Sequence, residues 1–172
     1  MSEDRWIPLA EVARAHGVRG ELRLRVFNSD SDILLGLDEV LIRFPNGDEH
    51  EVSVDAARRA NDAILMKLHS VDDRDRADEV RGALVCARRG EFPPLGEGEF
   101  YACDVIGLDV LLGEETLGHV KDFRSYPSVD ILVVRTEKGE LEVPLVAVYV
   151  DQVDIEGKRV LLRSIEGLEP TV

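Results

Sequence analysis

Histidines and cysteines are the residues of this chain best suited to metal binding or nucleophilic catalysis. The histidines are His16, His50, His69 and His119. None of them stands at metal-ligand spacing from another histidine or from a cysteine, and Cys86 and Cys103 form no CxxC redox pair. The sequence also lacks a GxSxG nucleophile elbow, a GxxxxGK phosphate loop and a GxGxxG run after a strand. The patterns therefore predict no metal site and no catalytic residue.

A run of arginines near the start of the chain is the densest group of side chains suited to binding an anion. It comprises Arg14, Arg19, Arg23 and Arg25, with His16 among them and Glu21 as the carboxylate within residues 14–25. One interpretation is an RNA contact, because an acidic chain needs a local basic patch to hold phosphate. The other interpretation is the solvated face of a strand. On the residues alone both interpretations stay open.

Gly17 and Gly20 lie within this run and look, at first sight, like the glycines of a phosphate-binding loop. A strand rather than a helix is predicted to follow them, so no helix N-terminus would point at a phosphate. We therefore interpret the two glycines as the structural residues of a tight turn or bulge between two strands.

The distribution of charge limits the classes of partner. The chain has 172 residues and a formal net charge of -14 at pH 7. Residues 1–93 hold 14 basic and 19 acidic residues, whereas residues 94–172 hold 7 and 16, so the two parts carry -5 and -9. An acidic field repels phosphate over a Debye length of about 8 Å and attracts basic proteins. The charge therefore disfavours broad nucleic-acid binding and favours a cationic protein as partner.

Short apolar runs with turn signals predict that the first part of the chain is a β structure. In residues 21–27, Leu22, Leu24 and Val26 alternate with arginines, the pattern of a half-buried strand. Further strands are predicted at 39–44, 49–60, 63–69 and 83–89, with a short helix over 71–82 and a weaker one over 31–37 that Ser31 or Asp30 would cap. These short strands and little helix favour a closed antiparallel barrel, which Trp6 would close.

A change of composition at residues 91–100 separates a second β-rich part. The run EFPPLGEGEF has two prolines, two glycines and no periodicity, which is typical of a linker. Strands are predicted beyond it at 108–112, 117–123, 130–136, 140–145, 147–155 and 158–164. They indicate either another barrel or a strongly curled sheet.

Two adjacent aromatic residues, Phe100 and Tyr101, stand where this linker ends. In a chain with only 5% aromatic residues, such a pair is a candidate anchor of a protein interface. The alternative, which the residues alone favour, is that the two rings plug the end of the second β unit.

The chain is expected to be a soluble cytoplasmic protein. Its N-terminal residues show no basic region followed by an apolar stretch, and no apolar run approaches the roughly 20 residues of a membrane span. Cys86 and Cys103 are expected to pack as small hydrophobic residues in a reducing compartment.

Blocks of sequence spread over the whole chain carry a resemblance to one family. The blocks are VARAHGVRGELRLRVF (12–27), LHSVDDRDRADEVRGALV (68–85), EFYACDVIGLDV (99–110), LGHVKDF (117–123), VDILVVR (129–135), LEVPLVAVYVDQVDI (141–155) and EGLEP (166–170). In this order they resemble the RimM family, bacterial ribosome maturation factors for the small subunit. The first block is similar to the family's opening signature and the third to its inter-domain aromatic pair.

The resemblance implies an all-β fold in two domains. Residues 1–92 would form a six-stranded antiparallel barrel similar to the barrel domain of translational GTPases. A linker at 93–98 would lead to a PRC-type β-barrel at 99–172, and the chain would hold one or two short helices.

The resemblance also implies a non-enzymatic assembly factor without a cofactor, acting as a monomer. It would bind the immature 30S subunit and assist maturation of the head region of 16S rRNA. The C-terminal part, with its charge of -9, would bind small-subunit ribosomal protein number 19, a basic protein. The implied protein contacts are Phe100, Tyr101 and Asp104, and the implied rRNA contacts are Arg14, His16, Arg19, Arg23 and Arg25.

One position departs from the family pattern, which commonly has two tyrosines where this chain has Phe100 and Tyr101. Phenylalanine keeps the ring and loses a hydroxyl, so burial survives while a hydrogen bond from position 100 is lost. A different class of function also stays open, namely an acidic two-barrel adaptor or regulatory protein unrelated to the ribosome.

Overall fold

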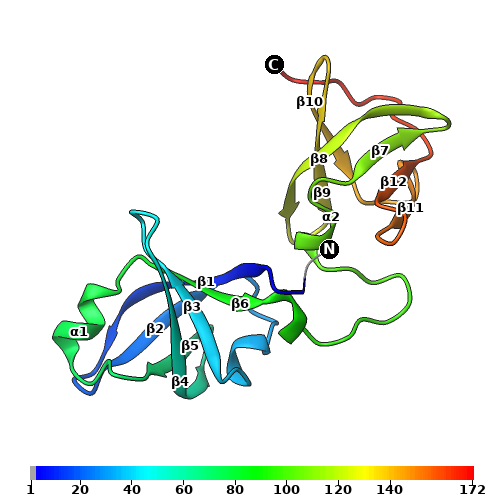
Figure 1. Ribbon diagram of the computed structural model, residues 1–172. Coiled ribbons are helices and arrows are strands. Elements are labelled where there is room, and N and C mark those ends of the chain that lie inside the picture. The colour runs from blue at the N-terminus through cyan, green and yellow to red at the C-terminus, as the bar shows by residue number, and fades with distance from the viewer. Residues whose placement is uncertain (1–2) are drawn as a thin grey trace. The chain divides into compact units, whose positions relative to one another are not determined.

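The chain divides into two compact units. The computed structural model describes residues 3–172, and the two units are Met1–Pro94, called unit one below, and Leu95–Val172, called unit two (Figure 1). Each unit is built on a six-stranded sheet. None of the described helices is long and apolar enough to cross a membrane.

Unit one is a closed antiparallel barrel, which confirms the predicted fold class. Its strands are β1 (Trp6–His16), β2 (Glu21–Val26), β3 (Glu39–Arg43), β4 (Glu49–Ala60), β5 (Ala63–Leu68) and β6 (Leu84–Arg88). They follow the order β1-β2-β5-β4-β3-β6, and β1 pairs with both β2 and β6 to close the barrel. Alternation fills the core as predicted, since Leu22 and Leu24 of β2 are fully buried.

The first strand, β1, has no alternating pattern in the sequence. Its pairing register shifts between Pro8 and Ala10 and again between Val12 and Arg14. Each shift adds a residue to one side of the ladder, so the side chains on either side of it lose the period of two that sequence analysis depends on. At its start, Trp6 is half-buried, and the Arg88 guanidinium carbon lies 4.5 Å from its ring centroid.

The helices of unit one are shorter than predicted. Helix α1 spans Arg74–Glu79, and the Asp73 carboxylate caps it by accepting a hydrogen bond from the Arg76 backbone N–H. The helix predicted over 31–37 is wrong. The structure has a single 3-10 turn at Ile33–Leu35, whose first flanking residue, Asp32, makes no side-chain cap. One turn is all that fits before Gly36, which has poor helix propensity and ends it.

Unit two is a curled six-stranded sheet. Its strands are β7 (Asp109–Leu112), β8 (Glu115–Ser125), β9 (Asp130–Thr136), β10 (Gly139–Pro144), β11 (Val150–Asp154) and β12 (Arg159–Leu162). They follow the order β10-β9-β8-β7-β12-β11, and β7 and β12 form a parallel pair. The strand predicted at 147–155 begins only at Val150, because the residues before it form turns.

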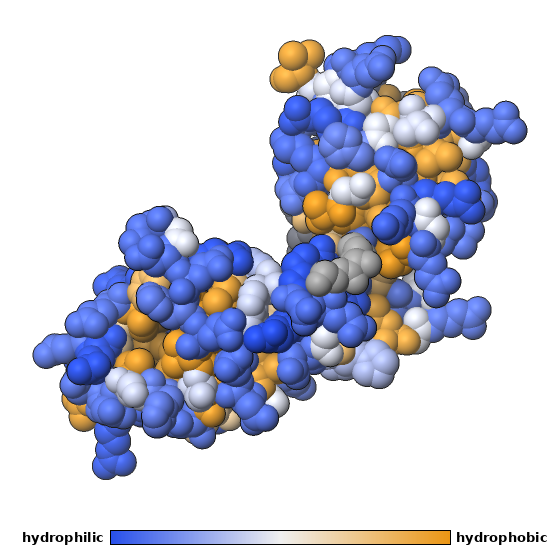
Figure 2. Space-filling model, in the orientation of Figure 1, coloured by the Kyte–Doolittle hydropathy of each residue, from blue (hydrophilic) through white to orange (hydrophobic). Residues whose placement is uncertain are grey.

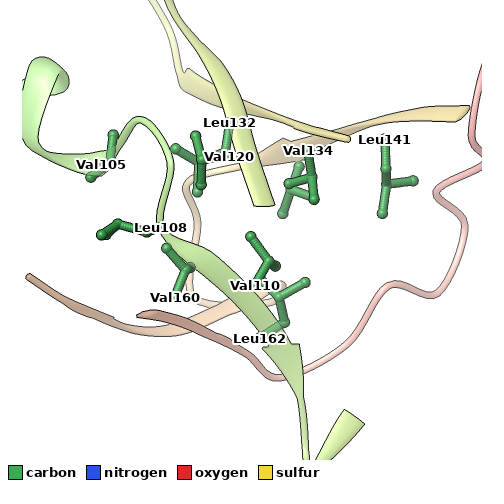
Figure 3. Packing of buried hydrophobic residues seen from close by; sticks show 10 residues of the cluster. Val105, Leu108, Val110, Val120, Leu132, Val134, Leu141, Val160 and Leu162 are labelled. Atoms are coloured by element: carbon green, nitrogen blue, oxygen red, sulfur yellow. The ribbon is translucent and has the colours of Figure 1, made fainter. Parts of the chain in front are cut away.

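The core of unit two lies on the inner side of this curled sheet. Figure 3 shows its buried aliphatic side chains pointing toward one another from β7, β8, β9, β10 and β12. A short helix that the sequence analysis did not predict, α2 (Ala102–Val105), contributes the fully buried Val105 to this core. The linker end therefore meets the sheet through α2.

The turn between β1 and β2 uses both glycines that the sequence singled out. Gly17 has a φ of +68° and Gly20 a φ of +89°. A Cβ on Gly17 would meet open space, whereas a Cβ on Gly20 would overlap the carbonyl oxygen of Val71. Both positions favour glycine, and at Gly20 the packing requires it as well.

Replacing each glycine by alanine separates these two constraints. Gly17→Ala should lower the free energy of unfolding by about 1–2 kcal/mol, the usual penalty of a left-handed backbone. Gly20→Ala should lower it clearly more, because Val71 must also move. Urea denaturation of both variants measures the difference, and equal losses would contradict the close approach of Gly20 to Val71.

Two candidate contact surfaces

The structure divides the arginine run into neutralised and unpaired members. On β2, Arg23 forms an ion pair with Asp62 at 3.3 Å, and Arg25 forms one with Glu11 at 2.6 Å. The Arg25 guanidinium carbon also lies 5.4 Å from the ring centroid of Phe27. Arg23 and Arg25 therefore share the outer face of the barrel as expected, but each already has a carboxylate partner.

Arg14 and Arg19 differ from these two. Both are exposed, and neither forms an ion pair or side-chain hydrogen bond with another of residues 3–172. The register of β1 and β2 places Arg14 directly opposite Arg23, while His16 lies opposite Glu21. Like charges in directly opposite positions destabilise a sheet, so the arginine at position 14 is expected to lower the stability of the fold.

Three further unpaired arginines were missed in the sequence analysis. Arg74, Arg76 and Arg81 lie in or just after α1, and each is exposed with no ion pair to any part of the chain that the structure describes. The sequence around them alternates basic and acidic residues, which suggests mutual neutralisation. Only the side-chain positions show that these ion pairs do not form.

The candidate protein contacts lie around α2 in unit two. Phe100 is half-buried, packs against the core cluster, and meets Phe123 edge to face with ring centroids 6.4 Å apart. Tyr101 is half-buried, and its carbonyl accepts a hydrogen bond from the Asp104 backbone N–H at 2.9 Å. Asp104 is 4% exposed and is the buried charged residue among those described. Phe100 thus plugs the core, the alternative that the residues favoured.

In unit two most of the basic side chains are paired with carboxylates. Arg124, Arg159 and Arg163 pair with carboxylates at 2.6–3.1 Å. Hydrogen bonds from Lys121 and Arg135 hold the pKa of Glu140 below its ordinary value. Many carboxylates have no ion pair within residues 3–172, among them Asp109, Glu114, Glu115, Glu137, Glu156, Glu166 and Glu169. The cations of unit two are therefore mostly neutralised, and its free charge is negative.

A groove of about 780 Å³ lies at the end of unit two where β8 begins. Its lining includes the apolar Leu117, Leu141 and Leu168 together with charged residues of both signs, Glu115, Arg135, Glu137 and Lys138. Because acidic and basic side chains both line the groove, it favours neither an anionic nor a cationic ligand. Among residues 3–172, no group of three or more His, Cys, Asp or Glu side chains is placed to hold a metal ion.

Comparisons with known proteins match both units. The family model described as the RimM N-terminal domain matches residues 7–92, and the model described as the RimM PRC barrel domain matches residues 102–168. The chain is 46% identical to the ribosome maturation factor RimM of Sorangium cellulosum over 168 residues, which cover 96% of this chain and 99% of that protein. It is 32% identical to RimM of Geotalea uraniireducens, with 97% of each chain covered. The solution structure of the N-terminal domain of RimM from Thermus thermophilus covers 54% of this chain and 99% of that one, with 23% identity and a TM-score of 0.44.

The opposed arginines on β1 and β2 give a stability test. Arg14→Glu should raise the free energy of unfolding by about 0.2–1 kcal/mol, because a pair of opposite charges replaces a pair of like charges. Arg19→Glu is the matched control, since it makes the same charge change in the turn without a cross-strand partner. Denaturation at low and high salt measures both, and a gain of equal size in the control would contradict the repulsion.

Proposed function

The chain belongs to the RimM family of ribosome maturation factors, and from this premise we propose that it binds the immature small ribosomal subunit and assists maturation of 16S rRNA in the head region. Unit two would dock on small-subunit ribosomal protein number 19, and unit one would approach rRNA. In this proposal the protein acts as a monomer, without a cofactor and without catalysing a reaction.

The observation that carries this proposal is a local group of unpaired arginines in unit one, which has no counterpart among the described residues of unit two. Unit one exposes a group of arginines that no carboxylate neutralises, alongside unpaired carboxylates such as Asp30, Asp38 and Asp48. Among the described residues of unit two, most cations are paired and many carboxylates are not, so its unpaired charge is mainly negative. Unpaired arginines suit phosphate, and unpaired carboxylates attract a cationic protein and speed its encounter. A ribosomal particle offers both kinds of partner side by side.

In unit two we propose Tyr101 as the main anchor for the protein, with Phe100 and Asp104 supporting it. Phe100 packs through its ring against Phe123 and the core of unit two. It therefore holds α2 on the sheet rather than presenting its ring to a partner. The neighbouring Tyr101 directly precedes α2, and its side chain combines an apolar ring with a polar hydroxyl, which suits a contact surface that is partly wet.

In unit one we propose that the rRNA contact draws on Arg14, His16, Arg19, Arg23 and Arg25. Arg14 and Arg19 are available without breaking an ion pair. Arg23 and Arg25 would first have to release Asp62 and Glu11, so they are expected to contribute less.

Tyr101→Ala should weaken binding to ribosomal protein number 19 and to immature subunits by about 2 kcal/mol or more, the cost of losing an interface anchor. Phe100→Ala should lower the melting temperature, because the contact with Phe123 is lost, so the affinities are measured below the melting temperature of each variant. Calorimetric titration with the isolated ribosomal protein and co-sedimentation with immature subunits measure the two affinities.

Two results would contradict this proposal. Unchanged affinity in Tyr101→Ala would show that the protein docks elsewhere on unit two. Failure of the unaltered chain to co-sediment with immature subunits would favour an adaptor that works away from the ribosome.

A further inference from the structure

Apart from Arg5 and Arg89, the arginines of unit one fall into two classes that differ in position. Those with a carboxylate partner are Arg23, Arg25, Arg43, Arg58, Arg59 and Arg88. Those without one among the described residues are Arg14, Arg19, Arg74, Arg76 and Arg81. The unpaired class comes entirely from the β1–β2 hairpin and from α1 with the residues just after it.

These two segments lie against each other at one end of the barrel. The Gly82 N–H donates to the Val12 carbonyl at 2.8 Å, and the Val12 N–H donates to the Ala83 carbonyl at 2.9 Å. On the other side of the hairpin, Gly20 abuts the backbone of Val71. Helix α1 accordingly packs beside the ends of β1 and β2, as Figure 1 shows.

These contacts bring four unpaired arginines to the seam between the hairpin and the helix. Arg81 precedes Gly82, and Arg14 is two residues beyond the Val12 that Gly82 contacts. Arg19 precedes Gly20, and Arg74 is three residues beyond the Val71 that Gly20 contacts. Figure 2 shows this end of unit one covered largely by hydrophilic side chains.

The acidic residues of α1 lie mostly away from this seam, with Asp78 as the exception. Ala77 is the buried residue of the helix, and Arg74 lies one turn before it at the edge that meets the barrel. Asp75 and Glu79 share the outward side with Arg76, and Asp73 is occupied as the helix cap. Asp78 lies one turn beyond Arg74, but the two form no ion pair in the described structure.

We propose that Arg14, Arg19, Arg74 and Arg81 form one surface, the basic end, that binds the sugar-phosphate backbone of an RNA helix. This inference rests on the proposed function and assigns α1 to its RNA contact. The planar guanidinium fork matches phosphate oxygens in a bidentate way. The large apolar residue exposed near the basic end is Val18, at 72%, whereas the exposed Phe27 lies beyond the far end of β2. The exposed imidazole nearby, that of His69, lies 3.4 Å from the Asp55 carboxylate. With four guanidiniums and no exposed Phe, Tyr or Trp near it among the described residues, the basic end suits an RNA backbone rather than unpaired bases.

Three double variants test the basic end, and each removes two positive charges from the full chain. They are Arg14→Gln with Arg19→Gln in the hairpin, Arg74→Gln with Arg81→Gln at the helix, and Arg59→Gln with Arg88→Gln as the control. Arg59 is paired with Asp32 near the loop after β2, and Arg88 lies beside Trp6 at the start of β1. The control therefore changes the net charge by the same amount, at positions outside the basic end.

The measurement is the affinity for purified immature small subunits at several salt concentrations, below the melting temperature of every variant. The hairpin and helix variants should each bind more weakly, and each should lower the slope of log affinity against log salt by about 2 in magnitude, because two phosphate contacts are lost. The control should keep the slope and affinity of the unaltered chain.

Several outcomes would overturn the inference. A helix variant that behaves like the control removes α1 from the RNA contact while the proposed function stands. A helix variant that binds more weakly with an unchanged slope shows that its contact is not with phosphate. If the unaltered chain does not bind the subunits at all, the proposed function fails and this inference fails with it.

Discussion

The double pairing of β1 closes the barrel of unit one, and the position of each unpaired arginine depends on it. On one side β1 pairs with β2, where the shift between Val12 and Arg14 fixes which side chain faces Arg23. On the other side β1 pairs with β6, and the bonds of Val12 to Gly82 and Ala83 hold α1 against the hairpin. A chain that left β1 unpaired would keep the same arginines but scatter them.

In both units, ion pairs on the outer face of the sheet determine which charged side chains remain unpaired. In both, neighbouring strands bring acidic and basic side chains into ion pairs across the outer face, as between Arg25 and Glu11 or between Arg159 and Asp154. Such exposed pairs contribute little to stability, but they decide which charges remain for a partner. Unit one is left with unpaired arginines at one end, in addition to unpaired carboxylates such as Asp30 and Asp48, whereas unit two is left mainly with carboxylates over its turns and tail. Net charge alone, which is acidic in both parts, conceals this difference.

Sequence reasoning succeeded where side chains follow a simple period or a known local motif. The alternation of Leu22 and Leu24 predicted β2, the run at 71–82 predicted a helix that the structure has in shorter form as α1, and the glycines predicted the hairpin turn. It failed at β1, because two register shifts break the period, and at residues 31–37, where Gly36 allows only a 3-10 turn. It could not separate Arg14 from Arg25, because their difference is made by Glu11 across the strand pair. The same limit hid Arg74 and Arg81, since ion pairs between charges close in sequence are settled only by side-chain geometry.

A density map of the full chain bound to an immature small subunit tests the division of contacts most directly. The account predicts that the hairpin at Gly17–Gly20 and α1 lie against the backbone of an RNA helix, with Tyr101 of unit two facing a ribosomal protein. A map in which α1 and the hairpin face solvent, with RNA lying instead along unit two, would contradict it.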